Sequence, residues 1–335
     1  MPPKDSTEQT NFAASLRKSL KATFSPATAQ LLQEAVSAQP DFGVIASILK
    51  LDPALATAIL SLVNSPFYGQ SGKISDLQRA AIILGNNEIL RIALSLSLQN
   101  SLTSILDKNG FDAFANWRII VWSAIGAELL AETLAPEEKE TAYICALVKD
   151  LSLLLYAATY PERLLPNLQQ PDFVRTGHVF AEWHKFLPEE HAALTAELLE
   201  EWHFPEEMIT AIINHHDLDH VYDYSPLTQA VIFGTRWAEV EFRSDPSPES
   251  LGQLKFMLGK VLKLSAESME DFRKRCSEKF GQLCSAMNIR DLPPEERLYA
   301  HSFQSIQDFH YQAKEIEGLT GGNEAIAACI ARHLR

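Results

Sequence analysis

The stretch AIINHHDLDH, residues 211–220, carries His215, His216 and His220 together with two aspartates. A hydrolytic metal site needs several convergent histidine or carboxylate ligands and an open position for an activated water. His215 or His216 could supply such ligands, and His191 could join them. A helix end explains the same residues, because an imidazolium is favoured by the helix dipole and can bond the last free carbonyls. The residue types alone favour the helix-end interpretation over the metal site.

The histidines are unevenly distributed, since all ten lie at or after residue 178. Any metal site must therefore take its remaining ligands from carboxylates. Adjacent residues on a helix point about 100° apart, so His215 and His216 are not expected to face one ion together. GxSxG, GxxxxGK[ST] and GxGxxG motifs are absent. Cys145 lies in the apolar run AYICALV, which predicts a buried thiol and not a nucleophile.

Two helices are expected to position the histidines, one over 188–202 and one over 205–216. Pro188 and Pro205 suit the first position of each helix, and only a short link separates the two. The distances from His191 to the end of the first helix and from the start of the second to residue 215 are both about 15 Å at ~1.5 Å per residue. Antiparallel packing therefore predicts that His191 lies level with His215 and His216.

Helical patterns cover most of the rest of the chain and predict an all-α fold. Leu55, Ile59 and Leu62 mark one apolar face, with Asp52 as the cap and Pro53 at the first helical position. Turn residues make 64–73 a loop. Further helices are expected at Ser75 or Asp76 to Leu84, 89–98, 118–132, 137–158 and 225–242.

Composition restricts the classes of partner. The 335 residues carry a net charge of −14, which disfavours a nucleic-acid surface. The clusters Arg17–Lys18 and Arg273–Arg275 are interpreted as solvated helix faces. No signal peptide is evident, and the longest uncharged run, Pro53 to Gly72, is interrupted by polar residues and turns, so membrane insertion is not expected. Four cysteines without CxxC spacing indicate reduced thiols in a cytoplasmic protein.

Two sequence signatures resemble one family. LDPALATAILSLVNSPFYG followed by ISDLQRAAIILGNNEILRIAL, and later HAALTAELLEEWHFPEEMITAIINHH, resemble the HD-related output domain, HDOD. The resemblance covers residues 21–220, preceded by an N-terminal segment, 1–20, and followed by a helical C-terminal extension, 221–335. The motif residues expected to be structural are Asp52, Pro53, Asn64, Ser65, Phe67, Gly85, Trp202 and Pro205.

The resemblance implies an HD-like helical bundle related to phosphohydrolases that hold one or two metals with a His, a His-Asp pair and a later Asp. Carried over by position, Trp122 stands for the first His, Lys149 for the His of the pair, and Thr235 for the last Asp, while Asp150 remains. What survives is a vestigial pocket, for which the candidates are Asp150, Lys149, His191, His215 and His216. We expect no catalytic residue, no metal and no cofactor there.

The expected function is that of a non-catalytic, regulatory module of bacterial signal transduction that binds other signalling proteins. One alternative is a divergent metal-dependent phosphohydrolase of nucleotides or cyclic dinucleotides. Another is a sensor that binds a nucleotide without hydrolysis. The residues indicate neither the identity of a partner nor an oligomeric state.

Overall fold

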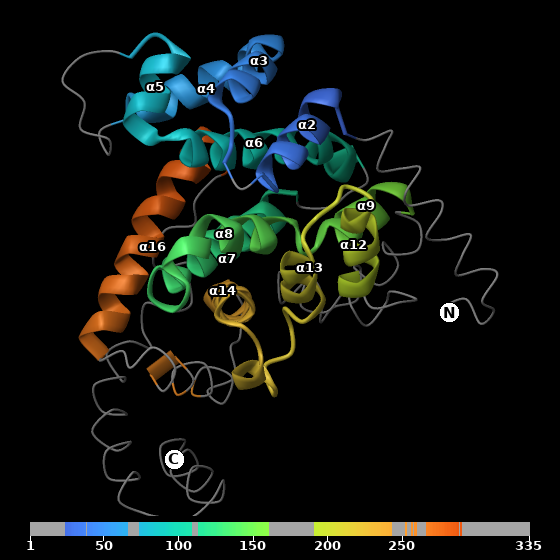
Figure 1. Ribbon diagram of the computed structural model, residues 1–335, viewed down its shortest axis with the longest axis vertical. Helices are drawn as coiled ribbons and strands as arrows, with labels where there is room; N and C mark the ends of the chain where they lie inside the picture. The colour runs from blue at the N-terminus through green and yellow to red at the C-terminus, as the bar shows by residue number, and fades with distance from the viewer. Residues whose placement is uncertain are drawn as a thin grey trace, which may run out of the picture.

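The computed structural model describes residues 24–37, 39–65, 74–108, 113–160, 191–242 and 266–287, together with 252, 256, 258, 259 and 289. Within these ranges every regular element is a helix, which confirms the all-α prediction. Figure 1 shows the arrangement: α3, α4 and α5 form a lobe at one end, α6 crosses beneath it, and α7, α8 and α14 lie at the centre.

We call α2 to α6 together the N-terminal lobe, in which α3 to α5 are short and sharp bends separate α3 from α4 and α5 from α6. Its elements are α2 (Pro26–Ala35), α3 (Phe42–Leu51), α4 (Pro53–Val63), α5 (Leu77–Leu84) and α6 (Asn86–Lys108). Asp52 caps α4 by accepting a hydrogen bond from the Leu55 N–H, 3.0 Å, and α3 and α4 meet at 118°. Gly85 takes φ +85° between α5 and α6, which meet at 114°; a side chain is disfavoured in this conformation.

Asn64 ends α4 and holds both sides of the loop that follows. Its Nδ2 donates to the carbonyls of Leu60, 2.7 Å, and Ile74, 2.8 Å, and its Oδ1 accepts from the Ile74 N–H, 2.7 Å. The motif asparagine therefore has a structural role in loop closure. Ser65 follows it at the end of the described helix, and Phe67 lies outside the described residues.

The central core is formed by α7 (Ala113–Leu134), a 3-10 turn, η2 (Pro136–Glu138), α8 (Lys139–Val148) and α14 (Pro226–Glu241). Ser225 caps α14 and Pro226 begins it. Gly126 and Gly234 let α7 and α14 approach closely, since a Cβ on Gly234 would lie 2.5 Å from the Ala127 nitrogen. Trp122 lies in this core, and the predicted burial of the Cys145 thiol is confirmed.

The helix expected over 137–158 is interrupted, which corrects the prediction of one continuous element. A turn at Lys149 and Asp150 separates α8 from α9 (Leu151–Thr159). The sequence pattern missed this turn because apolar residues continue on both sides of it. Pro136–Thr159, which is not an uncharged run, is by length and composition apolar enough to cross a membrane, and 89% of its most apolar window is buried inside the protein.

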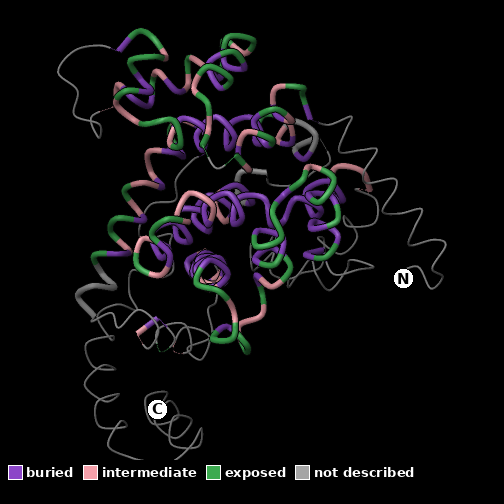
Figure 2. The backbone as a smooth tube through the Cα atoms, viewed as in Figure 1, coloured by how far each residue is buried: buried purple, intermediate pink, exposed green. Residues whose placement is uncertain are grey.

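Helix α16 (Ala266–Ala286) lies along one side of the molecule, against both α4 and α7 (Figure 1). Buried, intermediate and exposed residues alternate along it (Figure 2), and Phe280 and Cys276 are fully enclosed. Arg273 contacts Glu241 at 3.2 Å and Arg275 contacts Glu132 at 2.5 Å. Arg273, at 17% exposure, is therefore largely enclosed against α14, whereas Arg275 pairs with α7 and remains 45% exposed, as expected of a solvated face.

The extension predicted from residue 221 onwards contributes to the core, because both α14 and α16 pack on α7. The short 3-10 turn η4 (Val221–Asp223) connects the histidine region to α14. The division at residue 220 remains a sequence-based prediction.

Candidate functional site

A helical hairpin brings the histidines together. It consists of α12 (His191–Glu200) and α13 (Glu206–Ile213), which pack on each other beside α9. Trp202 in the connection packs on Phe24, with ring centroids 6.0 Å apart, and Pro205 is the residue before α13. The proximity predicted from the helix lengths is observed, since His191 Nε2 lies 3.3 Å from His215 Nε2.

His215 and His216 both reach His191, contrary to the expectation from helical geometry. Helix α13 ends at Ile213, and residues 214–216 form a turn in which the 100° rule no longer applies. His216 Nε2 therefore lies 3.2 Å from His191 Nε2. One atom of His191 thus contacts both neighbouring histidines.

The turn between α8 and α9 supplies the carboxylate of the cluster. Asp150 Oδ1 lies 3.3 Å from His191 Nε2 and 3.4 Å from His215 Nε2. Its other oxygen, Oδ2, accepts a hydrogen bond from Lys149 Nζ. Lys149 is only 2% exposed, so this ammonium group is enclosed together with its carboxylate. We call Asp150, His191, His215 and His216 the histidine cluster.

Burial and charge set the protonation states of the histidine cluster. Burial lowers the pKa of His215, the charge of His216 lowers it further, and the result is about 3, so this ring is neutral. The helix-end interpretation holds for His215 in that its ring bonds the Ile212 carbonyl, but not in the positive charge that it favoured. Burial alone raises the pKa of Asp150, but the Lys149 charge and the neighbouring histidines hold it well below its usual range.

The tautomer of His215 is fixed by the backbone. Its Nδ1 lies 2.6 Å from the Ile212 carbonyl oxygen, which can only accept, so Nδ1 carries the hydrogen. In the neutral ring the lone pair is then on Nε2, the atom that faces Asp150 and His191. A histidine that donates one N–H to a backbone carbonyl and presents its other nitrogen is typical of a metal ligand.

Glu239 contacts the histidine cluster but was not among the site residues predicted from the sequence. Its Oε1 lies 3.4 Å from His216 Nδ1, and its Oε2 accepts from Arg236 at 2.8 Å. Burial would raise the pKa of Glu239, but His216 and Arg236 outweigh burial and lower it to about 2. Glu239 lies one helical turn after Thr235, so the i+4 spacing on α14 could have identified it.

The positions expected to replace two family ligands lie elsewhere in the core. Thr235 Oγ1 donates to the Val231 carbonyl and accepts from Ser123. Trp122 packs edge-on against Phe242 and Phe280, with centroids 5.6 and 5.1 Å away. Both side chains are buried in the central core, where the contacts above hold them.

The four donors of the histidine cluster fit a single metal ion. One atom from each residue lies within 4.8 Å of the other three. Nitrogen and carboxylate oxygen donors suit zinc and related transition metals. The same residues do not provide for two ions, because the second oxygen of Asp150 is held by Lys149. An ion at this place would supply a positive charge and fix the turn, α12 and the end of α13 together.

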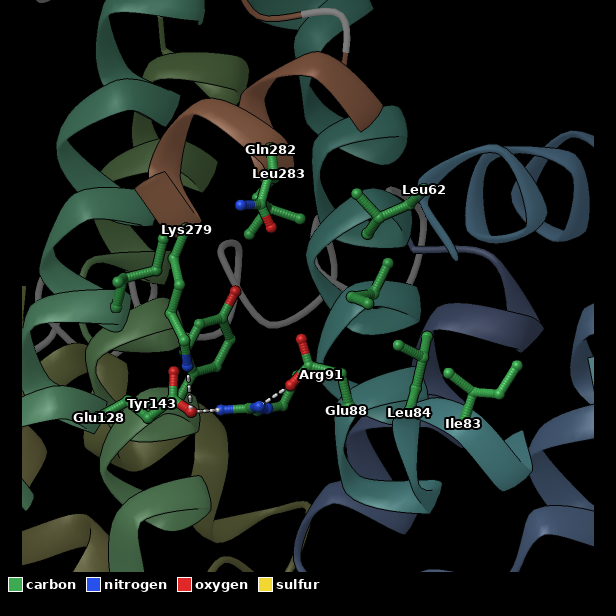
Figure 3. A pocket seen from close by; sticks show the side chains of 12 residues that line it. Leu62, Ile83, Leu84, Glu88, Arg91, Glu128, Tyr143, Lys279, Gln282 and Leu283 are labelled. Carbon is green, nitrogen blue, oxygen red and sulfur yellow. Dashed lines mark hydrogen bonds and ion pairs between the residues drawn. The ribbon is translucent and has the colours of Figure 1, made fainter. Parts of the chain in front are cut away.

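A separate charged cavity of about 220 Å³ lies between the N-terminal lobe and α16. Figure 3 shows Arg91 between Glu88 and Glu128, with Lys279 reaching Glu128 from α16. Burial raises the pKa of Glu128, but Arg91 and Lys279 more than compensate and lower it. These ion pairs join α6, α7 and α16, and none of the cavity's lining residues belongs to the histidine cluster.

Known structures share this helical fold. A candidate phosphohydrolase from Shewanella amazonensis SB2B aligns with a TM-score of 0.57 and 18% identity, over 79% of this chain and 93% of its own. A candidate signal transduction protein from Marinobacter aquaeolei VT8 has the same score and identity, over 83% and 66%. An HDOD domain protein of unknown function from Geobacter sulfurreducens aligns at 0.57 and 15%, over 83% and 98%. The fold is thus that of HD-like helical proteins.

The chain belongs to the HDOD family, whose domain model matches residues 22–218. An uncharacterised protein of Treponema pallidum (strain Nichols) is 28% identical over 218 residues. That match covers 62% of this chain and 40% of the relative's length.

Proposed function

We propose that this HDOD protein is a regulatory module of bacterial signal transduction, which binds other signalling proteins and does not hydrolyse a substrate. The observation that carries the proposal is the enclosed pair of Lys149 and Asp150. The ammonium group holds one oxygen of the carboxylate that a two-metal hydrolytic site would need. Three histidines converge near the other oxygen.

The number of protein donors also supports a non-catalytic role. Catalytic zinc sites keep three protein ligands and leave a position for water, whereas structural sites are closed by four. The histidine cluster offers four. A metal held by all of them has no open position in a tetrahedral arrangement, so the cluster is poorly suited to activating water.

The family and its neighbours support a role in signalling. The Marinobacter aquaeolei neighbour is named for signal transduction, while the Shewanella amazonensis neighbour is named for hydrolysis. The Lys149–Asp150 pair of this chain favours the first of these functions.

The N-terminal lobe offers a surface for a protein partner. Leu51 is 78% exposed at the end of α3, and Ile82 is 84% exposed on α5. Large aliphatic side chains this exposed bury apolar area when a partner covers them. Both side chains lie outside the hydrophobic core, so we expect a polar replacement to leave the fold intact.

A hydrolysis assay tests the non-catalytic part of the proposal. Purified protein is incubated with cyclic dinucleotides, nucleotides and an activated phosphodiester, in the presence of Mg²⁺, Mn²⁺, Fe²⁺ or Zn²⁺. We expect no turnover above the buffer rate. Turnover that disappears in Asp150→Ala contradicts the proposal and favours the hydrolase alternative.

Affinity capture from cells of the source bacterium tests the partner. We expect a signalling protein to be retained by wild type and lost with Leu51→Asp/Ile82→Asp. The matched control is Lys50→Glu, which changes the charge of the exposed residue beside Leu51. Equal retention by both variants contradicts docking at this lobe.

The nucleotide-sensor alternative requires a cavity of suitable size. That alternative places the nucleotide at the histidine cluster, whereas the cavity of Figure 3, of about 220 Å³, is lined by other residues. A thermal-shift screen against nucleotides is expected to show no rise in Tm; a rise that is lost in His191→Ala supports the sensor instead.

A further inference from the structure

We propose that the histidine cluster binds one zinc-like transition-metal ion as a closed structural site, and that the Lys149 ammonium replaces a second metal on Asp150. The proposal adds a ligand to the site of the proposed non-catalytic function. The two can fail separately, because one is tested by counting ions and the other by turnover.

The contacts around His191 Nε2 are better explained by an ion than by hydrogen bonds. This atom lies 3.2–3.3 Å from three others: His215 Nε2, His216 Nε2 and Asp150 Oδ1. An imidazole nitrogen has either one hydrogen or one lone pair. Hydrogen bonding can therefore satisfy at most one of the three contacts well, whereas a central cation attracts all four donors at once.

The spacing of the donors points to four-coordination. Four ligands bound at ~2.0–2.1 Å in a tetrahedron lie about 3.3–3.4 Å from one another. The measured separations are 3.2 Å, 3.3 Å, 3.3 Å and 3.4 Å. These four of the six separations are close to the edges of such a tetrahedron, and all four donor atoms lie within 4.8 Å of one another.

The outer atoms of three donors are already fixed by other groups. His215 Nδ1 contacts the Ile212 carbonyl, His216 Nδ1 contacts Glu239, and Asp150 Oδ2 contacts Lys149. Metal ligands are commonly oriented by partners of this kind. The donors come from the α8–α9 turn, the start of α12 and the turn after α13.

Lys149 sets the number of ions at one. Its ammonium group bonds Asp150 Oδ2, whereas His191 and His215 contact Oδ1, and the ammonium is enclosed there by the core. A second divalent cation on that oxygen would lie against a fixed positive charge, which is unfavourable at this burial. The cationic side chain thus neutralises the carboxylate on that side.

His216 provides the side from which an ion exchanges. Its side chain is 43% exposed, while those of the other three donors are enclosed. We expect it to be the ligand whose loss is best tolerated by the fold. His216→Ala therefore serves as the principal test variant, and His191→Ala as the second.

The experiment uses full-length protein without an affinity tag, stripped with a chelator and dialysed against Zn²⁺ or Co²⁺. We expect one ion per chain by elemental analysis, a rise in Tm of roughly 5 °C at 100-fold excess over Kd, and the visible absorption of four-coordinate Co²⁺. His216→Ala should lose the absorption and most of the Tm rise. His220→Ala is the matched control, because His220 is exposed and bonds Asp217 outside the cluster; it should bind as wild type does.

Lys149→His tests the assignment of the lysine. We expect this variant to bind more than one ion per chain, or to bind the first with altered affinity, while wild type stays at one. Absence of binding to wild type overturns the metal site, and two ions in wild type overturn the role of Lys149. Binding that persists unchanged in both His216→Ala and His191→Ala also overturns the proposal.

Discussion

The close approach of α7 and α14 gives a sharp test of the packing that positions the site. A Cβ added to Gly234 would lie 2.5 Å from the Ala127 nitrogen and 2.8 Å from both Ala127 Cα and the Ser123 oxygen. Ordinary contacts begin at 3.4 Å, so the helices would have to separate by 3.4 − 2.5 = 0.9 Å at this point. The obstructing atoms all belong to the backbone and cannot rotate away.

The magnitude follows from two opposing effects. Overpacking a core costs ~1–3 kcal/mol, and rigid backbone neighbours place this site at the upper end or above it. Replacing a helical glycine by alanine returns about 1 kcal/mol of helix propensity. We therefore expect Gly234→Ala to lower the free energy of unfolding by at least about 2 kcal/mol.

Gly126 is the matched control, because it lies on the opposite side of the same crossing. A Cβ there would be 3.4 Å from Gly234 Cα, an ordinary contact, so Gly126→Ala should be neutral or stabilise by up to about 1 kcal/mol. Urea unfolding followed by circular dichroism, with equal m-values, measures both variants. Equal stability of the two variants would refute the reasoning.

Two further predictions concern the N-terminal lobe and α16. Asn64→Ala should lower the free energy of unfolding by about 2 kcal/mol, because the N–H and C=O of Ile74 lose their hydrogen bonds to Asn64. The control is Asn86→Ala, which removes one exposed hydrogen bond of 3.2 Å and should change the free energy of unfolding by less than about 0.5 kcal/mol. Similar losses in the two variants would contradict the role of Asn64 in loop closure. The lowered pKa of Glu128 means that its carboxylate stabilises the fold above its unfolded pKa, about 4.5, and that this contribution is lost as the pH falls through the lower folded value. Glu128→Gln should therefore lower the free energy of unfolding by about 3 kcal/mol at pH 7. The variant should also show a weaker dependence of this free energy on pH below about 4.5. An unchanged slope in acid titration would contradict the stabilising role of the Glu128 carboxylate.

The helices and the histidine hairpin were predictable because their signals are local. Asp52 and Ser225 cap helices that begin with proline, and these patterns identify helix starts directly. The two histidines lie at similar distances along the chain from the link between the helices, which brings His191 and His215 together. Such conclusions require only spacing along the chain and the helical rise.

The remainder depends on tertiary packing, which spacing does not encode. The turn at Lys149 interrupts an apolar run that has the pattern of one continuous helix, so its effect on Asp150 was not visible. Glu239 was missed because the comparison with the family was centred on Thr235, one turn away. Arg273 and Arg275 appear solvent-facing in sequence, and only the docking of α16 gives them carboxylate partners.

The most direct test of the account is the position of metal in crystals of the full-length protein. Anomalous diffraction measured on either side of the zinc absorption edge locates every such ion, and we predict one peak, enclosed by Asp150 Oδ1 and the three histidines, with Lys149 still bonded to Asp150 Oδ2. Two peaks bridged by Asp150, or a peak coordinated without the histidines, would contradict the account.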